Sequence, residues 1–278
     1  MNEHVHGKVV VITGAASGFG RLVAQKVAAL GAQVVLSDVD VEALNQAVSE
    51  ITQAGGVALA QPADVTSLEQ MHSLAKVAID TYERIDVMIN NAGVMPLAFY
   101  SDHEQAYDAW SKCIDINIKG VLHGILAVHD RMLEQGRGHV VNLSSIYGNF
   151  PVVGAGVYGA TKAAVNFLSE SLRVESQGRI KVTTVKPTGV PGTALGAGII
   201  NPEAIVGILG QNAPAYGQLM QAHAAGELPA EHTDVNHIEY YALDPEYLAD
   251  QIVYAINQPW GVSVADITIR ASGDGYIL

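Results

Sequence analysis

The sequence predicts a single doubly wound α/β domain, in which helices cover both faces of a parallel sheet. Short apolar runs alternate with helical patterns, so the hydrophobic period switches repeatedly between two and about 3.6 residues. A glycine-rich turn follows the first apolar run and precedes the first helical pattern. No Pro/Ser-rich linker or charge run divides the 278 residues, of which 49% are hydrophobic. We therefore expect residues 1–278 to form one domain with a large core.

Seven strands are expected in alternation with six helical regions. The strands are residues 9–12, 33–38, 57–60, 85–90, 139–144, 180–186 and 264–269. The helical regions are residues 22–30, 41–51, 67–82 and 102–133, a segment through 158–162, and a last helix that Asp244 and Pro245 begin. The carboxyl ends of parallel strands meet at one edge of the sheet, where ligands bind in this class of fold.

The long stretch between the last two strands, residues 188–243, departs from this alternation. It exceeds an ordinary connection, and glycines give it a permissive backbone near its start: Gly189, Gly192, Gly196 and Gly198. Its apolar residues could cover a bound ligand: Ile199, Ile200, Ile205, Val206, Ile208 and Leu209. We expect a mobile substrate lid. A subunit contact is the alternative, because only 15% of the residues are charged, against roughly 25% in an average domain.

Composition excludes several classes of function. The net charge of −13 repels nucleic acid and anionic lipid, and no apolar stretch or signal sequence indicates a membrane or secreted protein. The single cysteine, Cys113, cannot form an internal disulfide and is expected to be buried by packing. None of the ten histidines pairs at helical spacing with another His or a Cys, so we expect no metal site. The expectation is a soluble cytoplasmic protein.

Tyr158 and Lys162 stand four residues apart, so a helix places them on one face. An adjacent cation favours the phenolate and lowers the pKa of a tyrosine toward neutrality, which suits acid–base work. Ser145, upstream, could then hold a substrate oxygen. A surface helix pair is the alternative interpretation. The turn at residues 13–20 argues against it, because a glycine-rich turn between a buried strand and a helix is a phosphate cradle.

With these motifs in order, the chain resembles the short-chain dehydrogenase/reductase family, in its group with TGxxxGxG and YxxxK motifs. The resemblance covers residues 8 to about 192 and returns at the last helix and strand, and it implies a Rossmann-type fold. The catalytic tetrad that it implies is Asn117, Ser145, Tyr158 and Lys162, with Asn117 holding a water in the proton relay. It also implies a homo-oligomer, either a dimer or a tetramer.

The resemblance further implies which residues contact a dinucleotide cofactor. These are Gly14, Ser17, Phe19 and Gly20 at the pyrophosphate, Asp64, Val65, Asn91, Ala92 and Gly93 at the adenine and its ribose, Tyr158 and Lys162 at the nicotinamide ribose, and Pro187 and Val190 at the nicotinamide. Each match has an ordinary alternative, such as turn formation for Asn91 and Gly93. Three features depart from the family pattern: Phe19 in place of Ile, Thr188 in place of the usual glycine, and the insertion at 188–243.

Asp38 predicts the cofactor. An acid at the end of the second strand accepts hydrogen bonds from a ribose 2′-hydroxyl and repels a 2′-phosphate. Ala16 and Val39 stand where relatives that prefer the phosphorylated cofactor often carry a basic residue. The prediction is therefore NAD, with a helix N-cap as the alternative role of Asp38.

The substrate is expected to be a neutral, apolar secondary alcohol or ketone. Residues 187–269 contain no Lys or Arg, so this segment offers no clamp for a carboxylate or phosphate. Apolar residues lie near the expected site: Met95, Pro96, Phe150, Pro151 and Val152. A 3-oxoacyl reductase is an alternative that the missing cations and Asp38 disfavour. A dinucleotide-sensing binding protein is the other alternative, although it would not need an intact tetrad.

Overall fold

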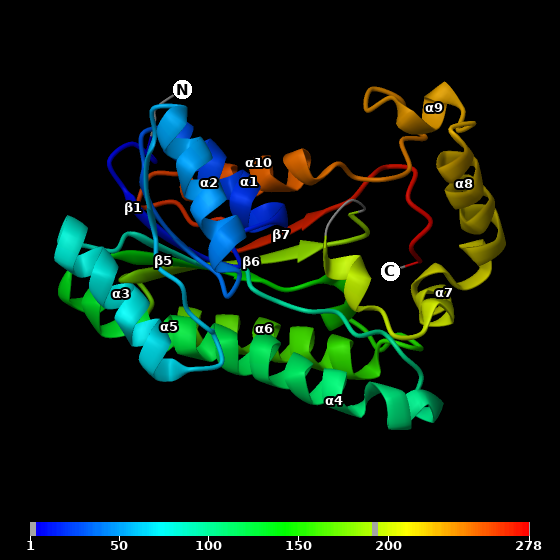
Figure 1. Cartoon of the computed structure of the whole chain (residues 1–278), viewed down its shortest axis with the longest axis horizontal. Helices are drawn as coiled ribbons and strands as arrows, with labels where there is room; N and C mark the ends of the chain where they lie inside the picture. The colour runs from blue at the N-terminus through cyan, green and yellow to red at the C-terminus, as the bar shows by residue number, and fades with distance from the viewer. Residues whose placement is uncertain (1–3, 191–193, 278) are drawn as a thin grey trace.

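The computed structural model describes residues 4–190 and 194–277 and contains, across those residues, one sheet of seven parallel strands (Figure 1). The strands are β1 (Val9–Thr13), β2 (Gln33–Ser37), β3 (Val57–Ala60), β4 (Val87–Asn90), β5 (Gly138–Leu143), β6 (Ile180–Pro187) and β7 (Asp266–Ile269). Their order is β3-β2-β1-β4-β5-β6-β7, so the winding reverses between β1 and β4. The predicted fold class is confirmed, and this reversal is the place where such sheets bind ligands.

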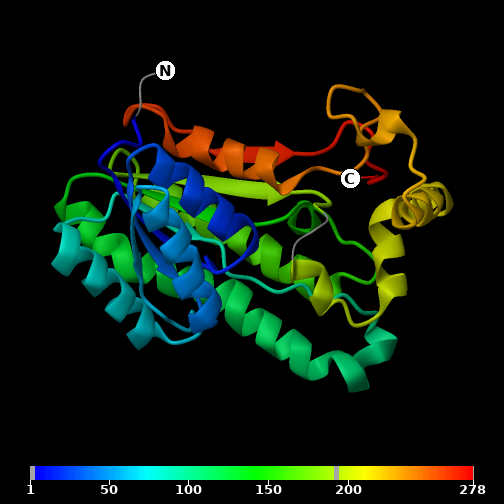
Figure 2. The same cartoon turned by 45° about the horizontal axis from the view of Figure 1, so that its top comes forward.

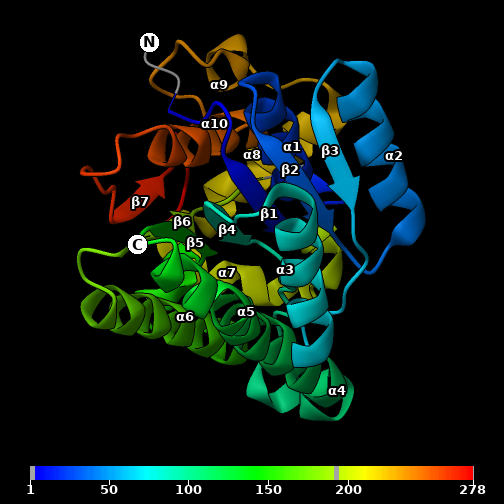
Figure 3. The same ribbon diagram turned by 90° about the vertical axis from the view of Figure 1, so that its left-hand side faces the viewer.

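Two helix layers enclose the sheet (Figures 1 and 3). One consists of α1 (Gly18–Ala29), α2 (Val41–Gln53) and α10 (Pro245–Ile256), and the other of α3 (Leu68–Tyr82), α4 (His103–Ile114), α5 (Gly120–Glu134) and α6 (Gly156–Glu175). Successive residues of β1 enter opposite cores, with Val10 and Ile12 in one and Val9 and Val11 in the other. Because both faces are covered, the strand is apolar throughout and shows no alternation with polar residues.

The long helical region expected at residues 102–133 is present, and it contains a change of helix type. A π-helical segment, Asp115–Lys119, joins α4 to α5 and carries Asn117. A π turn adds a residue to one helical turn, and such segments are frequent at functional sites. The helical pattern of the sequence predicted the region as a whole but not this change of helix type.

The insertion at 188–243 is mostly helical. Its described residues contain three 3₁₀ segments, η4 (Ala194–Gly198), η5 (Pro202–Ile205) and η6 (Gly210–Asn212), and three helices, α7 (Val206–Leu209), α8 (Ala213–Ala225) and α9 (Ala230–Thr233). Figures 1 and 2 show α7 and α8 beyond the carboxyl ends of β6 and β7. The six apolar residues expected to form one face do not do so, because Ile208 and Leu209 are buried whereas Ile205 and Val206 are exposed. Gly192 lies outside the described residues.

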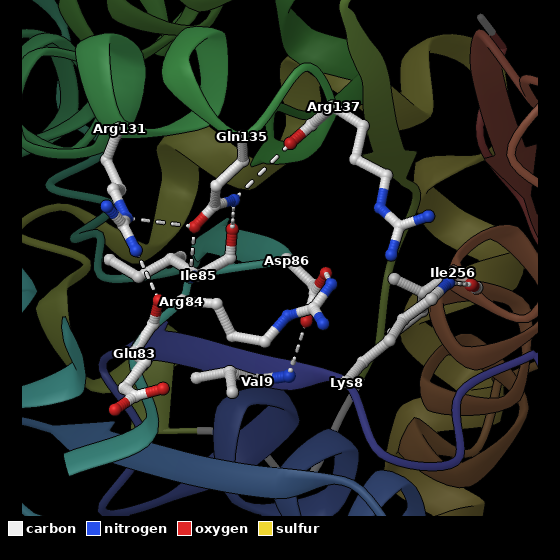
Figure 4. Close-up of polar contacts among 10 residues, drawn as sticks. All are labelled: Lys8, Val9, Glu83, Arg84, Ile85, Asp86, Arg131, Gln135, Arg137 and Ile256. Atoms are coloured by element: carbon white, nitrogen blue, oxygen red, sulfur yellow. Dashed lines mark hydrogen bonds and ion pairs between the residues drawn. The ribbon is translucent and has the colours of Figure 1, made fainter.

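A polar network closes the opposite, amino-terminal edge of the sheet (Figure 4). The buried carboxylate of Asp86 accepts a hydrogen bond from the Val9 amide at 3.0 Å and pairs with Arg84 at 2.5 Å. The Gln135 side chain accepts from the Ile85 amide at 3.0 Å and donates to its carbonyl at 2.8 Å. These bonds satisfy backbone groups at the start of β1 and β4, so this edge is fixed.

Among residues 4–190 and 194–277, no helix combines the length and apolar character needed to cross a membrane.

Candidate active site

The glycine-rich turn lies between β1 and α1, and steric contacts require glycine at two of its positions. Gly14 has a φ of 64°, and a Cβ there would lie 2.8 Å from the Cα of Ala92. A Cβ on Gly20 would lie 2.3 Å from the Gly14 carbonyl oxygen. Asn91, which follows β4, fixes the turn because its Nδ2 donates to the Thr13 and Gly14 carbonyls, each at 2.9 Å. The turn therefore packs closely onto the segment after β4, and the N-terminus of α1 that follows it is suited to a phosphate.

Two other matched residues of this turn have different surroundings. Ser17 is the N-cap residue of α1, yet its side chain makes no capping hydrogen bond. Its hydroxyl is thus not committed to the helix. Phe19 is partly buried against the core on the α1 side of the sheet, as expected for a packing residue.

Asp38 follows β2 and faces the same turn. Its Oδ2 accepts from the Ala16 amide at 3.1 Å, and its Oδ1 accepts from the Asp40 amide at 3.1 Å. The N-cap of α2 is Asp40, whose side chain accepts from the Ala43 amide at 3.0 Å. The interpretation of Asp38 as the helix N-cap is therefore wrong. Its carboxylate instead lies against the backbone of the glycine-rich turn.

The residues expected near the adenine form two groups. Asp64 Oδ1 accepts from the amide and hydroxyl of Thr66 at 2.9 and 2.8 Å, and the Val65 carbonyl accepts from His123 Nδ1 at 2.8 Å. Gly93 instead lies beside the tetrad, because a Cβ there would lie 3.3 Å from Asn117 Oδ1 and 3.5 Å from Lys162 Nζ. Ala92 lies between the two groups, and its amide faces Thr13 Oγ1 at 3.3 Å.

Helix α6 carries Tyr158 and Lys162 on one face, and both side chains are buried. Lys162 Nζ lies 5.7 Å from the centre of the Tyr158 ring and donates to the Leu143 carbonyl at 2.9 Å. Ser145 stands two residues beyond the end of β5, and a hydrogen bond from its side chain lowers the pKa of Tyr158. The structure thus brings together the phenol, the ammonium and the hydroxyl that the sequence singled out.

Burial dominates the electrostatics of this trio. It raises the pKa of Tyr158 well above its ordinary range, while the hydrogen bond from Ser145 opposes that rise and Cys113 adds to it. Burial also lowers the pKa of Lys162 to about 8. Lys162 was expected to lower the pKa of Tyr158 toward neutrality, but in this structure the pKa of Tyr158 is raised. Removal from water is the largest influence on both groups, and it favours the protonated phenol of Tyr158.

Asn117 lies on the buried side of the π segment. Its Nδ2 donates to the Val94 carbonyl at 3.0 Å and to Thr161 Oγ1 at 3.1 Å, and its Oδ1 accepts from the Val94 amide at 3.0 Å. The side chain is fully engaged with protein groups, so a water at this residue would bind its main chain. Cys113 Sγ lies 3.2 Å from the same Nδ2, and burial raises the pKa of this thiol, which fits a packing role.

The segment after β6 explains one departure from the family pattern. Thr188 Oγ1 lies 3.2 Å from Asp274 Oδ2 and 3.4 Å from the Ile269 carbonyl, so it ties this segment to β7 and the C-terminal tail. Pro187 ends β6 and is buried, and Val190 packs against the core on the α1 side. Sequence reasoning missed this tie because the residues are far apart along the chain.

Three further tyrosines lie near Tyr158 that the sequence did not single out: Tyr147, Tyr216 and Tyr276. Tyr147 stands two residues after Ser145, which was the one local signal available. In the described ranges, no group of three or more His, Cys, Asp or Glu side chains is arranged to hold a metal ion.

Comparisons with known proteins agree with this geometry. Residues 8–203 match the family model described as short chain dehydrogenase. An uncharacterized oxidoreductase of Listeria innocua is 35% identical over 265 residues, which cover 95% of this chain and 96% of the relative. Among solved structures, a short chain dehydrogenase/reductase from Burkholderia phymatum in complex with NAD has a TM-score of 0.74 and 30% identity, covering 96% of this chain and 90% of its own.

A metagenomic short-chain oxidoreductase in complex with NADP has a TM-score of 0.72 and 26% identity, covering 96% of this chain and 98% of its own. The similar structures thus include both nicotinamide cofactors. The fold, the buried trio on α6 and these matches lead to one conclusion: the chain belongs to the short-chain dehydrogenase/reductase family and is an oxidoreductase.

Proposed function

We propose that this protein transfers a hydride between NAD and a neutral, apolar secondary alcohol or ketone. The observation that carries the proposal is the buried Tyr158, hydrogen-bonded to Ser145 and adjacent to Lys162, at the same sheet edge as the glycine-rich turn. Such a trio handles a proton at an oxygen atom, and the turn suits a dinucleotide.

The residues of the turn fit a dinucleotide cofactor. Glycines at 14 and 20 let the turn pack closely against Asn91 and Ala92, and the helix N-terminus that follows attracts a pyrophosphate. Asp38 would accept hydrogen bonds from the ribose hydroxyls, and its charge disfavours a 2′-phosphate. When bound, the cofactor supplies hydride acceptance or donation. This arrangement supports NAD over NADP.

Each member of the tetrad has a role set by its contacts. Tyr158 holds the transferable proton, which it would donate to a ketone oxygen or, as phenolate, take from an alcohol. Ser145 would hydrogen-bond the same substrate oxygen. Lys162, with a pKa near 8, supplies positive charge beside the phenol. Asn117 anchors the Val94 backbone opposite α6 and keeps Thr161 in place.

The surroundings of Tyr158 support an uncharged substrate. The side chains packed in its cluster are apolar or phenolic, and include Leu97, Ile146, Val152, Ile208 and Leu209. The absence of Lys and Arg from residues 187–269 leaves no cation there for a carboxylate or phosphate. A 3-oxoacyl reductase fits this environment less well.

The insertion at 188–243 would act as the substrate lid. Ala204, Ile208 and Leu209 are buried in the same cluster as Tyr158, so this part of the insertion covers the site. Hydrogen exchange tests the proposal: protection of the segment should rise when a substrate analogue joins the cofactor. Strong protection in the ligand-free oligomer, unchanged by either ligand, would favour a subunit contact.

A homo-oligomer and a cytoplasmic location complete the proposal. Large apolar side chains are exposed on the outer helices: Phe167 and Val174 on α6 and Tyr107 on α4. Patches of this kind commonly mark subunit contacts. The single, buried Cys113 suits a reducing compartment.

The decisive experiment follows nicotinamide absorbance while the protein turns over a panel of secondary alcohols and ketones. Reduction of NAD with at least one alcohol, or oxidation of NADH with a ketone, would support the enzyme. Tight cofactor binding with no turnover of any substrate would instead support a dinucleotide sensor.

A further inference from the structure

Three tyrosines from distant parts of the chain meet beside the catalytic Tyr158. Tyr147 lies in the 3₁₀ turn η3 (Ile146–Gly148), and its ring packs edge-on against Tyr158 with the centroids 5.6 Å apart. Tyr216 comes from α8, and Tyr276 from the C-terminal tail. The rings of Tyr216 and Tyr276 lie 5.9 Å apart and their hydroxyls 3.5 Å apart. All three belong to the packed cluster that contains Tyr158.

The C-terminal tail is fixed in place by a buried carboxylate. Asp274 pairs with Arg270 and faces Thr188 Oγ1 at 3.2 Å, and Arg270 also donates to the Tyr276 carbonyl at 2.8 Å. A Cβ on Gly189 would lie 1.8 Å from the Tyr276 hydroxyl, so glycine there allows the phenol to approach the segment after β6. The segment after β6, which lies at the edge of the site, therefore also holds Tyr276 in position.

The same tail is joined to the lid. The Ile277 amide donates to the Ile208 carbonyl at 3.1 Å, and Asn212 Nδ2 donates to the Gly275 carbonyl at 3.0 Å. Figures 1 and 2 show the tail between the sheet and the helices of the insertion. Tyr216 and Tyr276 therefore approach each other from the lid and the tail.

The hydroxyls of these three tyrosines can each form further hydrogen bonds. Among the described residues, the Tyr147 hydroxyl has no hydrogen-bond partner, and the Tyr216–Tyr276 contact is long. A phenol can donate one hydrogen bond and accept others. Burial, followed by the neighbouring phenols, raises the pKa of Tyr147 and of Tyr276 well above the ordinary range, so both remain neutral at physiological pH.

We infer that Tyr147, Tyr216 and Tyr276 form a recognition site for a second, uncharged oxygen of the substrate, at the end remote from the reacting carbon. This inference rests on the proposed function, which it refines to apolar alcohols or ketones with a distal hydroxyl or carbonyl group. A polar group in an otherwise apolar site gives strong discrimination, because a bound substrate that lacks the matching oxygen covers these hydroxyls and leaves them unpaired. Residues 187–269 contain no Lys or Arg for an anionic group, and Arg270, beside the tail, is paired with the Asp274 carboxylate.

The test compares near-isosteric substrates with and without the distal oxygen. One pair is trans-4-ethylcyclohexanol and trans-4-(hydroxymethyl)cyclohexanol, and a longer pair is 4-phenyl-2-butanol and 4-(4-hydroxyphenyl)-2-butanol. The wild type should show a higher kcat/KM for the oxygenated member of at least one pair. Tyr276→Phe, Tyr216→Phe and Tyr147→Phe should each lower that ratio by about three- to tenfold, as expected for one hydrogen bond. Thermal unfolding of each variant verifies folding.

Tyr254→Phe is the matched control, because Tyr254 is exposed on α10 and the same atom is removed. It should keep the wild-type ratio. Turnover of both pairs without preference by the wild type, or a ratio unchanged in all three variants, would overturn the inference alone. A wild type that turned over no secondary alcohol or ketone would overturn the proposed function and this inference with it.

Discussion

The two ends of the sheet each contain a buried lysine, and the two lysines differ in almost nothing except their neighbours. Lys8 is 6% exposed and Lys162 is 5% exposed. Lys8 Nζ donates to the Ile256 carbonyl at 2.8 Å, and Lys162 Nζ donates to the Leu143 carbonyl at 2.9 Å. Burial lowers both pKa values to about 8. Burial and a perturbed pKa alone therefore do not assign different roles to the two lysines.

The neighbours make the distinction. Lys8 lies over the Trp260 ring at 4.7 Å from its centre, and Arg137 and Lys181 approach the same ring at 4.9 and 5.3 Å. After burial, Lys181 is the next influence lowering the pKa of Lys8, while Asp86 raises it. Lys162 instead lies beside the Tyr158 phenol and directly follows Thr161, which contacts Asn117.

The two ends of the sheet also differ in how tightly the covering segments are packed. The amino end is held by backbone-directed bonds from Asp86 and Gln135 (Figure 4). The carboxyl end is covered by short helices of the insertion and by the tail, and in α8 no residue is buried. Elements with few buried apolar contacts open most readily. We expect the first end to carry stability and the second to carry function.

The largest expected effect is that of Tyr158→Phe. Loss of the hydroxyl removes the acid–base group and keeps the ring, so turnover should fall by on the order of 10² to 10⁴. NAD binding, followed by titration of intrinsic fluorescence, should be nearly unchanged. A variant that retained more than about a tenth of wild-type turnover, with chemistry rate-limiting, would contradict the role given to this end of the sheet.

The next effect concerns cofactor choice at the same end. NAD should exceed NADP in kcat/KM by at least about tenfold, since about 1.4 kcal/mol of unfavourable phosphate contact near Asp38 is sufficient. Asp38→Ala should narrow that gap. Asp40→Ala is the matched control, because it removes an equal charge from the α2 N-cap, two residues away. Equal efficiency with both cofactors in the wild type would rule out this role for Asp38.

The smallest effect is a pH dependence of stability at the amino end. Lys8 has a folded-state pKa near 8, below its ordinary 10.5, so between these values the unfolded chain binds more protons. The free energy of unfolding of the wild type should therefore gain a contribution from Lys8 as the pH rises from about 8 toward 10.5. Lys8→Met cannot have this contribution. Urea unfolding of both proteins at pH 7 and at pH 9.5 measures the effect. From pH 7 to 9.5, the free energy of unfolding of Lys8→Met should fall, relative to that of the wild type, by on the order of 1 kcal/mol. The same difference between the two proteins at both pH values would refute the assignment.

Local patterns predicted the parts of the fold and site that depend on nearby residues. The alternation gave the seven strands, and the spacing of Tyr158 and Lys162 gave their shared face on α6. The glycine positions followed from turn sterics, and both glycines are required by close backbone contacts. Each of these features depends only on residues that are close together in the sequence.

The parts that could not be predicted depend on distance or on burial. Asp38 and Asp40 are two residues apart and chemically equal, so only the folded backbone decides which one caps α2. The raised pKa of Tyr158 comes from the depth of its burial, which sequence spacing does not reveal. The contact between Tyr276 and Tyr216 joins the tail to the insertion. The two residues are 60 positions apart, so no local sequence pattern predicts the contact.

The central claim is that the two buried lysines have different functions because their neighbours differ. The most direct test measures steady-state turnover and thermal unfolding of Lys162→Met and Lys8→Met side by side. The expected result is a turnover loss of about 100-fold or more for Lys162→Met and a loss below about threefold for Lys8→Met, with both variants folded. Equal turnover losses in the two variants, or a larger loss in Lys8→Met, would contradict the account.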